Sequence, residues 1–282
     1  MTAPLLHAAW VRAADAQPTR VVLFLHGILG SGSNLRGLAQ AFVQADPSIA
    51  ALLVDLRLHG RSVGFLPPHD VHACAADLVG LEHSLTWPVS GVVGHSFGGK
   101  VALAYHRLRP ELARVVTLDS DPGSRPDRVG SEQTTSVLAM LAQLPRTYDR
   151  REDFVAQVQA AGHPRGIADW LAMNLERGGS QTAPHFTLRV DLPGIHQLLD
   201  SYFSTDLWSV LEGSRAQVDV VVGGRSQVWG EPQRARLEAL SARRPEGIHV
   251  TVLAGAGHWV HVDDPAGLRA ALLASQPQTT TP

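Results

Sequence analysis

A chain of 282 residues is long enough for one α/β domain with a large insertion or for two smaller domains. Hydrophobic residues make up 44% of it and charged residues 18%, which excludes a wholly disordered chain and is ordinary for a globular protein. The formal net charge of −2 gives no basic field, so neither nucleic acid nor a membrane surface is expected as a partner.

Cysteine usage and the N-terminal region bear on location. The single cysteine, Cys74, excludes an intrachain disulfide and a cysteine-ligated zinc site, and it favours a reducing, cytoplasmic compartment. Residues 1–10 lack the basic segment of a signal peptide, and the apolar run at residues 21–25 is far shorter than a membrane span. We therefore expect a cytoplasmic protein.

Short β-branched runs alternate with longer helical patterns at both ends of the chain. Because these runs are continuously apolar, they are typical of strands buried on both faces of a parallel sheet. Strands are predicted at residues 20–26, 50–55, 91–94, 114–119, 218–223 and 248–253, and helices at about residues 35–45, 69–85, 98–109, 232–243 and 265–275. Residues 5–12 are a candidate antiparallel edge strand. The pattern predicts a mostly parallel, doubly wound α/β sheet.

The middle of the chain follows a different pattern. It has no comparable buried strand, and its amphipathic stretches are interrupted by glycine and proline. These stretches are residues 136–144, 151–161, 167–175 and 192–203. We predict an α/β core formed by residues 1–122 and 213–275, a helical cap inserted at 123–212, and a disordered polar tail at 276–282.

The sharpest local motif is GHSFGG, which lies directly after a predicted strand and directly before a predicted helix. Its glycines permit a tight turn that exposes the Ser96 hydroxyl, as in a nucleophile elbow, and the Phe97 amide at the helix start can donate to an oxyanion. A purely structural turn is the plainer interpretation. A phosphate-binding loop is disfavoured, because Val101 occupies the position where that motif needs serine or threonine.

Two further turns follow predicted strands. HGILGSG begins at residue 26 and offers a second amide donor at Ile28, although a simple strand-ending turn would look the same. GAGHWVH places His258 on a loop after the last strand, where it could act as general base for Ser96. His261 and Asp263 offer only two ligands for a metal, so no metal is expected.

The motifs HGILGSGSN, DLRLHGRS, GHSFGGK and GAGHWVH, in this order over nearly the whole chain, resemble the α/β-hydrolase superfamily. LDSDP and GGRSQVW are similar to a small bacterial carboxylesterase branch, close to the abhydrolase-domain-containing 11 group. The resemblance implies the α/β-hydrolase fold with an inserted cap. It also implies Ser96 as nucleophile, His258 as base, and the amides of Ile28 and Phe97 as oxyanion hole.

The acidic member of the triad departs from the common superfamily pattern. The position after the penultimate strand, where most members carry aspartate, is Ser226. The branch that the chain resembles takes its acid after the strand that follows the elbow, which corresponds to Asp119, with Ser226 as an auxiliary hydrogen-bonding partner. Asp121 stays as a close competitor, and either aspartate could merely cap the following loop.

Four further residues are candidates for substrate contact. His95 and Trp259 flank the predicted catalytic residues, while Trp170 and Phe203 belong to the predicted cap. Packing inside the cap is the plainer role for the last two.

The predicted function is hydrolysis of small carboxylic esters, or thioesters, through an acyl-enzyme on Ser96, with a small-molecule ester as partner and without metal or organic cofactor. C–C bond hydrolysis, perhydrolysis and lyase chemistry use the same residues and stay open. An inactive hydrolase fold that only binds a ligand is the alternative from a different class. The sequence carries no signature of the substrate, the acyl length or the oligomeric state.

Overall fold

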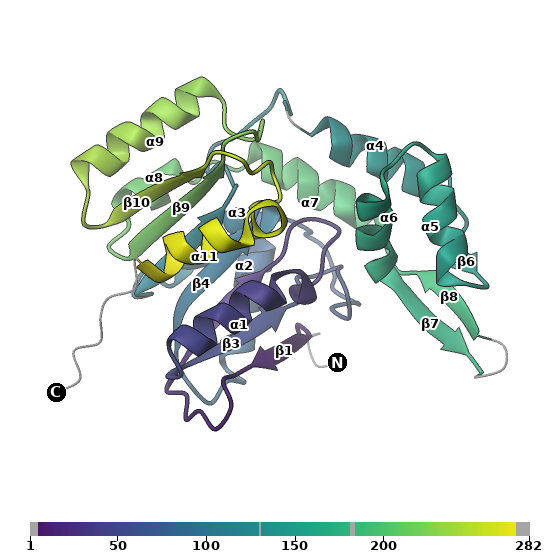
Figure 1. The fold of residues 1–282 in the computed structure, drawn as a ribbon, viewed down its shortest axis with the longest axis horizontal. Helices are drawn as coiled ribbons and strands as arrows, with labels where there is room; N and C mark the ends of the chain where they lie inside the picture. The colour runs from purple at the N-terminus through teal and green to yellow at the C-terminus, as the bar shows by residue number, and fades with distance from the viewer. Residues whose placement is uncertain (1–4, 130, 181–183, 275–282) are drawn as a thin grey trace.

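The computed structural model describes residues 5–129, 131–180 and 184–274, so the tail predicted to be disordered lies outside the described residues. Its centre is a seven-stranded sheet (Figure 1). In spatial order the strands are β1 (Ala8–Val11), β3 (Ile49–Val54), β2 (Arg20–Leu25), β4 (Val89–His95), β5 (Arg114–Leu118), β9 (Gln217–Gly223) and β10 (Ile248–Leu253). Only β1 in this sheet is antiparallel, as the edge-strand prediction expected.

Helices cover both faces of this sheet, which explains why its strands are continuously apolar. They are α1 (Arg36–Ala45), α2 (Val71–Glu82), α3 (Phe97–Leu108), α8 (Trp208–Gly213), α9 (Glu231–Arg243), α10 (Val260–Asp263) and α11 (Pro265–Ala274). Successive residues of β2 serve opposite cores. Phe24 packs in the core beneath α1 and α11, whereas Leu23 and Leu25 pack with α2 and α3. The predicted α/β-hydrolase fold class is confirmed by this architecture.

The parallel strands all end at one edge of the sheet. Leu25 lies opposite Gly94, and His95 lies opposite Leu118. The loops that follow β2, β4, β5, β9 and β10 therefore meet above the same edge, where α/β sheets place their functional residues. This register brings together segments that are more than 200 residues apart along the chain.

Residues 123–212 lie between β5 and β9 and carry most of the remaining elements. These are α4 (Glu132–Leu141), β6 (Thr147–Tyr148), α5 (Arg151–Ala160), α6 (Arg165–Leu171), a 3-10 helix η2 (Ala172–Asn174), β7 (Leu175–Gly179), β8 (Pro184–Leu188) and α7 (Leu192–Ser204). Figure 1 shows α4, α5, α6 and the short strands grouped beside the main sheet. We call residues 123–212 the insert; it also contains α8 except for Gly213.

The insert contains a structure that the sequence did not predict. Strands β6, β8 and β7 form a three-stranded antiparallel sheet. The sequence of β7, LERGG, ends in two glycines, and β8 begins with Pro184, so neither shows the apolar run or alternation of a strand. The four amphipathic stretches do form helices, with boundaries shifted by up to four residues.

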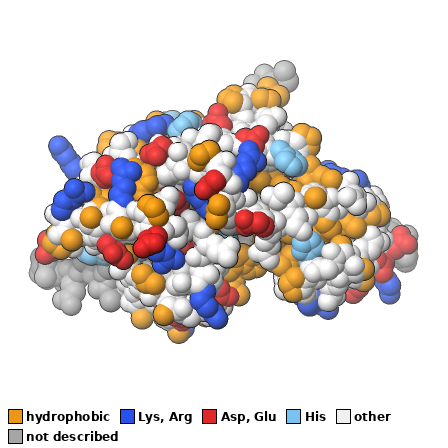
Figure 2. Space-filling model, turned by 90° about the horizontal axis from the view of Figure 1, so that it is seen from above, with side chains coloured by type: hydrophobic (Ala, Val, Ile, Leu, Met, Phe, Trp, Pro, Cys, Tyr) orange, Lys and Arg blue, Asp and Glu red, His pale blue; other side chains and the backbone are white. Residues whose placement is uncertain are grey.

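The surface is mixed in charge. Figure 2 shows Lys and Arg side chains interspersed with Asp and Glu, so this view presents no continuous basic face. Within residues 5–274, excluding the short undescribed gaps, no helix has the length and hydropathy that a membrane span requires.

Candidate active site

Ser96 occupies a strained turn between β4 and α3. Its backbone has φ 52° and ψ −116°, outside the regions that residues with a side chain usually adopt. A side chain on Gly94 would collide with the backbone of Gly98, and one on Gly98 would collide with the carbonyls that end β2. The turn therefore needs glycine at both positions, and it exposes the Ser96 hydroxyl at the sheet edge.

A chain of hydrogen bonds joins Ser96, His258 and Asp119. Nε2 of His258 lies 2.9 Å from Oγ of Ser96, and Nδ1 lies 2.7 Å from Oδ2 of Asp119. The carboxylate can only accept, so Nδ1 carries the proton and Nε2 is free to accept from the serine. The imidazole is therefore held as the tautomer that a general base for Ser96 requires.

Asp119 and Asp121, the two candidate acids, have different surroundings. Asp119 is completely buried, and its Oδ2 also accepts a hydrogen bond of 2.5 Å from Oγ of Ser226. Its Oδ1 accepts from the Gly223 amide at 3.0 Å. Asp121 instead accepts from the Gly123 amide at 2.7 Å, which caps the next loop. Of the two carboxylates, Asp119 is the one in contact with His258.

The two predicted oxyanion donors lie beside the serine. Ile28 follows β2, Phe97 begins α3, and both line the same pocket as Ser96. Among the hydrogen bonds of the described residues, neither amide donates to an acceptor within the protein. Both N–H groups are thus available to an oxygen bound next to Ser96.

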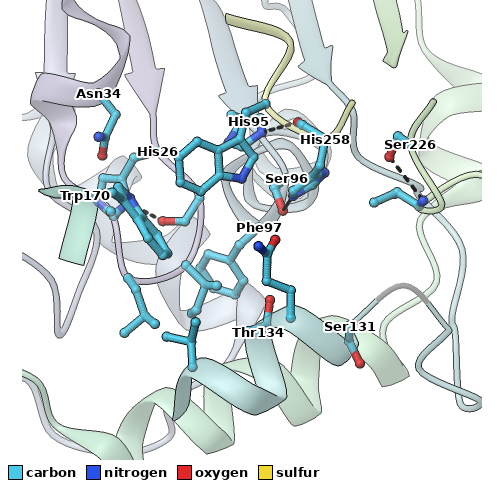
Figure 3. Close-up of a pocket in the computed structure, with 18 of the residues that line it drawn as sticks. His26, Asn34, His95, Ser96, Phe97, Ser131, Thr134, Trp170, Ser226 and His258 are labelled. Atoms are coloured by element: carbon cyan, nitrogen blue, oxygen red, sulfur yellow. Dashed lines mark hydrogen bonds between the residues drawn. The ribbon is translucent and has the colours of Figure 1, made fainter. Parts of the chain in front are cut away.

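Ser96 lines a cavity of about 630 Å³ that lies between the sheet edge and the insert. His95, Trp259, Trp170 and Phe203 all line it, so the structure brings these four predicted residues to one pocket. Figure 3 shows Trp170 across the cavity from His258, with Thr134 and Ser131 of the α4 region along its lower wall. The rings of Trp170 and Trp259 pack edge to face, with their centres 5.0 Å apart. This contact links the insert to the loop that carries His258.

His95 has a more specific contact than the sequence suggested. Its Nε2 donates to the backbone carbonyl of His258 at 2.9 Å (Figure 3), and its ring also packs 4.6 Å from that of His261. Burial, followed by the neighbouring His261 and His258, lowers the pKa of His95 well below its ordinary value. Burial also lowers the pKa of His261 to about 4. Both imidazoles are therefore neutral at pH 7, and His95 holds the loop that carries His258.

Two other residues at this site, His26 and Asn174, were not assigned a role from the sequence, whereas His59 was expected to order a loop beside the pocket. His26 and His59 support the turn that carries Ile28, and Asn174 of η2 reaches the same turn from the insert. Of these residues, His26 could have been noticed in the sequence, because it directly precedes Gly27 in the glycine-rich turn. In the described part of the chain, no three His, Cys, Asp or Glu side chains are arranged to hold a metal ion.

Comparison with known proteins agrees with this geometry. Residues 22–271 match the model of the alpha/beta hydrolase family. The chain is 30% identical over 250 residues to mouse sn-1-specific diacylglycerol lipase ABHD11, covering 86% of this chain and 76% of the relative. It is 28% identical to esterase YbfF of Escherichia coli, covering 92% and 96%. A marine microorganism esterase superposes with a TM-score of 0.79 at 19% identity, covering 97% of this chain and 100% of that one. The chain therefore belongs to the α/β-hydrolase family and is similar to its ABHD11-like esterase group.

Proposed function

We propose that the protein is a serine carboxylesterase that hydrolyses small carboxylic esters. The observation that carries the proposal is the hydrogen-bonded chain Ser96–His258–Asp119 beneath an open cavity. Relatives named as esterases or as a diacylglycerol lipase support an ester as the substrate class. Cys74, the one cysteine, is buried, and burial raises the pKa of its thiol, which favours serine as the nucleophile.

In the first half of the reaction, Oγ of Ser96 attacks the acyl carbon while Nε2 of His258 takes the hydroxyl proton. The amides of Ile28 and Phe97 donate to the oxyanion of the tetrahedral intermediate. The C–O bond to the alcohol then breaks, and the departing oxygen takes the proton from Nε2. Asp119 stabilises the imidazolium through the 2.7 Å hydrogen bond to Nδ1.

In the second half, water attacks the acyl-enzyme and His258 accepts its proton. Collapse of the second tetrahedral intermediate releases the carboxylic acid, and the proton returns to Oγ of Ser96. The net reaction consumes one water and one ester and gives one acid and one alcohol. Every proton passes through Nε2 of His258, and the mechanism needs no metal or organic cofactor.

The proposal gives the insert the role of a cap. Residues 1–122 and 213–275 would form the catalytic core, and residues 123–212 would form the wall of the cavity that faces Ser96. Trp170 and Phe203 of the insert line the cavity opposite the sheet edge, which supports this division. A cytoplasmic location belongs to the same proposal, because the unpaired Cys74 suits a reducing compartment.

Covalent labelling tests the proposal most directly. A fluorophosphonate should modify Ser96 stoichiometrically, and wild-type protein should hydrolyse p-nitrophenyl esters, with matched thioesters run beside them. Labelling should disappear in Ser96→Ala. Ester turnover without labelling, or labelling at another residue, would contradict the assignment of the nucleophile. A protein that binds esters and shows neither labelling nor turnover would be an inactive hydrolase fold.

A further inference from the structure

The peptide group that joins Gly27 to Ile28 is held in place by hydrogen bonds to its carbonyl oxygen. The Gly27 carbonyl accepts hydrogen bonds from Nδ1 of His26 at 2.7 Å and from the Gly30 amide at 3.0 Å. A trans peptide directs its N–H opposite to its C=O. Fixing the Gly27 carbonyl therefore fixes the direction of the Ile28 N–H, the proposed oxyanion donor.

Leu29 closes this turn in an unfavourable conformation. Its φ is 59°, in the left-handed region, which is unfavourable for a residue with a side chain. Such a conformation persists only where its surroundings hold it. If Leu29 relaxed, the Gly30 amide would leave the Gly27 carbonyl, and only the contact with Nδ1 of His26 would still hold the peptide group that carries the Ile28 N–H.

One side of Leu29 is held by the core. Its amide donates to Nε2 of His59 at 3.0 Å, and Nδ1 of His59 donates to the Arg57 carbonyl at 2.9 Å. Burial is the main cause that lowers the pKa of His59 to about 3, so this imidazole stays a neutral acceptor at pH 7. The Leu29 amide is therefore bound within the loops that follow β2 and β3.

The other side of Leu29 is held by the insert. Nδ2 of Asn174 donates to the Leu29 carbonyl at 2.9 Å and to the Leu171 carbonyl at 3.2 Å. Asn174 is 8% exposed, and its own carbonyl accepts from the Arg189 amide at 2.9 Å. Asn174 is thus fixed within the insert by its side-chain bond to Leu171 and its backbone bond to Arg189, while its side chain also binds a residue 145 positions earlier in the chain.

We propose that Asn174 is a positioning residue that fixes the oxyanion turn through the Leu29 carbonyl, so that a docked insert completes the catalytic site. This inference rests on the proposed esterase function. Asn174 acts through Leu29 on the direction of the Ile28 N–H. Its loss should weaken stabilisation of the tetrahedral intermediate more than binding of the planar ester.

The test uses the full chain with Asn174→Leu, which removes the donor at similar volume, and Asn174→Asp, which replaces it with an acceptor. We expect kcat on one activated ester to fall by about tenfold to a hundredfold, with KM changed less than about threefold. Affinity for a trifluoromethyl ketone, which forms a tetrahedral adduct on Ser96, should fall by the same factor as kcat/KM. Asn174→Gln, which keeps the amide, should restore part of the loss.

Arg146→Met is the matched control. It removes another side-chain donor within the insert, whose NH2 group bonds the Val190 carbonyl at 2.9 Å and, among the described residues, has no hydrogen bond to the oxyanion turn. It should leave kcat and the affinity for the ketone unchanged. If Asn174→Leu and Asn174→Asp do not fold, Asn174→Ser shortens the donor out of reach without adding bulk, and the same measurements apply.

Folded Asn174 variants with wild-type kcat and wild-type ketone affinity would overturn the inference. Loss of kcat/KM through KM alone, with the ketone affinity retained, would also overturn it, because that result indicates only a structural role. An absence of ester turnover in both wild type and Arg146→Met would instead overturn the proposed function. The two failures are therefore distinguishable.

Discussion

At the scale of single residues, hydrogen bonds fix the orientation of the Asp119 carboxylate. Its Oδ2 bonds His258 and Ser226, and its Oδ1 accepts from the Gly223 amide. The side chain is also fully buried. The serine at the common acid position thus contacts the carboxylate that faces His258. A hydroxyl at this point orients a charge that another residue supplies.

This arrangement predicts unequal effects for three substitutions. Asp119→Asn preserves shape but lets the imidazole take the other tautomer and removes the charge opposite the imidazolium, so kcat should fall by about 10³–10⁴-fold. Ser226→Ala removes one neutral hydrogen bond and should cost about tenfold. Asp121→Asn, which does not touch His258, is the matched control and should stay near wild type. Severe loss in Asp121→Asn with little loss in Asp119→Asn would reverse the assignment.

Ser96→Ala is predicted to abolish turnover while preserving the fold. Because the members of a catalytic triad act as a unit, removal of the nucleophile alone removes most of the rate enhancement that the triad provides. The expected fall in kcat is therefore about 10⁴-fold or more. Ester hydrolysis is measured alongside thermal unfolding, which should stay within a few degrees of wild type. Wild-type turnover in a folded variant would show that another residue attacks the substrate.

At the scale of elements, the sheet and its loops were predictable and the contacts of the insert were not. Continuous apolar runs give β2, β4, β5, β9 and β10 because burial on both faces leaves a strong pattern. Asn174 carries no such signal, since its role depends on how η2 packs against a turn 145 residues away. His59 was expected to order a loop beside the pocket, but its specific partner, the Leu29 amide, is visible only in the structure.

A buried lysine on α3 joins that helix to both ends of the insert. Nζ of Lys100 donates to the carbonyls of Gly123 at 2.8 Å, Tyr202 at 2.6 Å and Thr205 at 3.1 Å, and it lies 4.3 Å from the centre of the Tyr202 ring. In the sequence, Lys100 is notable as the only lysine of the chain and as part of an incomplete phosphate-binding motif. In the structure the ammonium binds backbone carbonyls where the insert leaves and rejoins the core.

Lys100 therefore predicts a pH dependence of stability. Burial is the main cause that lowers its pKa to about 8, whereas an unfolded lysine titrates near 10.4. Below about pH 8, Lys100 is protonated in both the folded and the unfolded state. Between about pH 8 and 10.4 the unfolded state binds more protons, so the contribution of Lys100 to the free energy of unfolding rises with pH, by up to about 3 kcal/mol.

Urea unfolding of wild type and Lys100→Met at several pH values isolates this contribution. The free energy of unfolding of wild type minus that of the variant should be constant below about pH 8 and should then increase up to about pH 10.4. The nearby Asp121 and Arg125 are present in both proteins, so their own titration largely cancels in the difference. A difference that is flat or falls across this range would contradict a lysine that loses its proton more easily in the folded state.

At the scale of the whole molecule, the cavity exists because the insert faces the carboxyl edge of the sheet. Trp259 belongs to the loop after β10 and Trp170 to α6, and their edge-to-face contact closes one side of the cavity. Val137 of α4 and Leu199 of α7 line it as well. A mostly apolar cavity of about 630 Å³ favours acyl groups of limited length.

This shape predicts how kcat/KM depends on acyl length. Each added methylene should favour the reaction by up to about 0.8 kcal/mol, or about fourfold, until the space is filled, after which kcat/KM should fall. Trp170→Ala removes a wall of the cavity and should move the optimum to longer chains. Trp10→Ala is the matched control, because Trp10 contacts Trp87 and Arg12 at the far edge strand. The measurement is kcat/KM on p-nitrophenyl esters from acetate to dodecanoate. An optimum at the longest chain in wild type, or an optimum that Trp170→Ala leaves in place, would show that this cavity does not hold the acyl group.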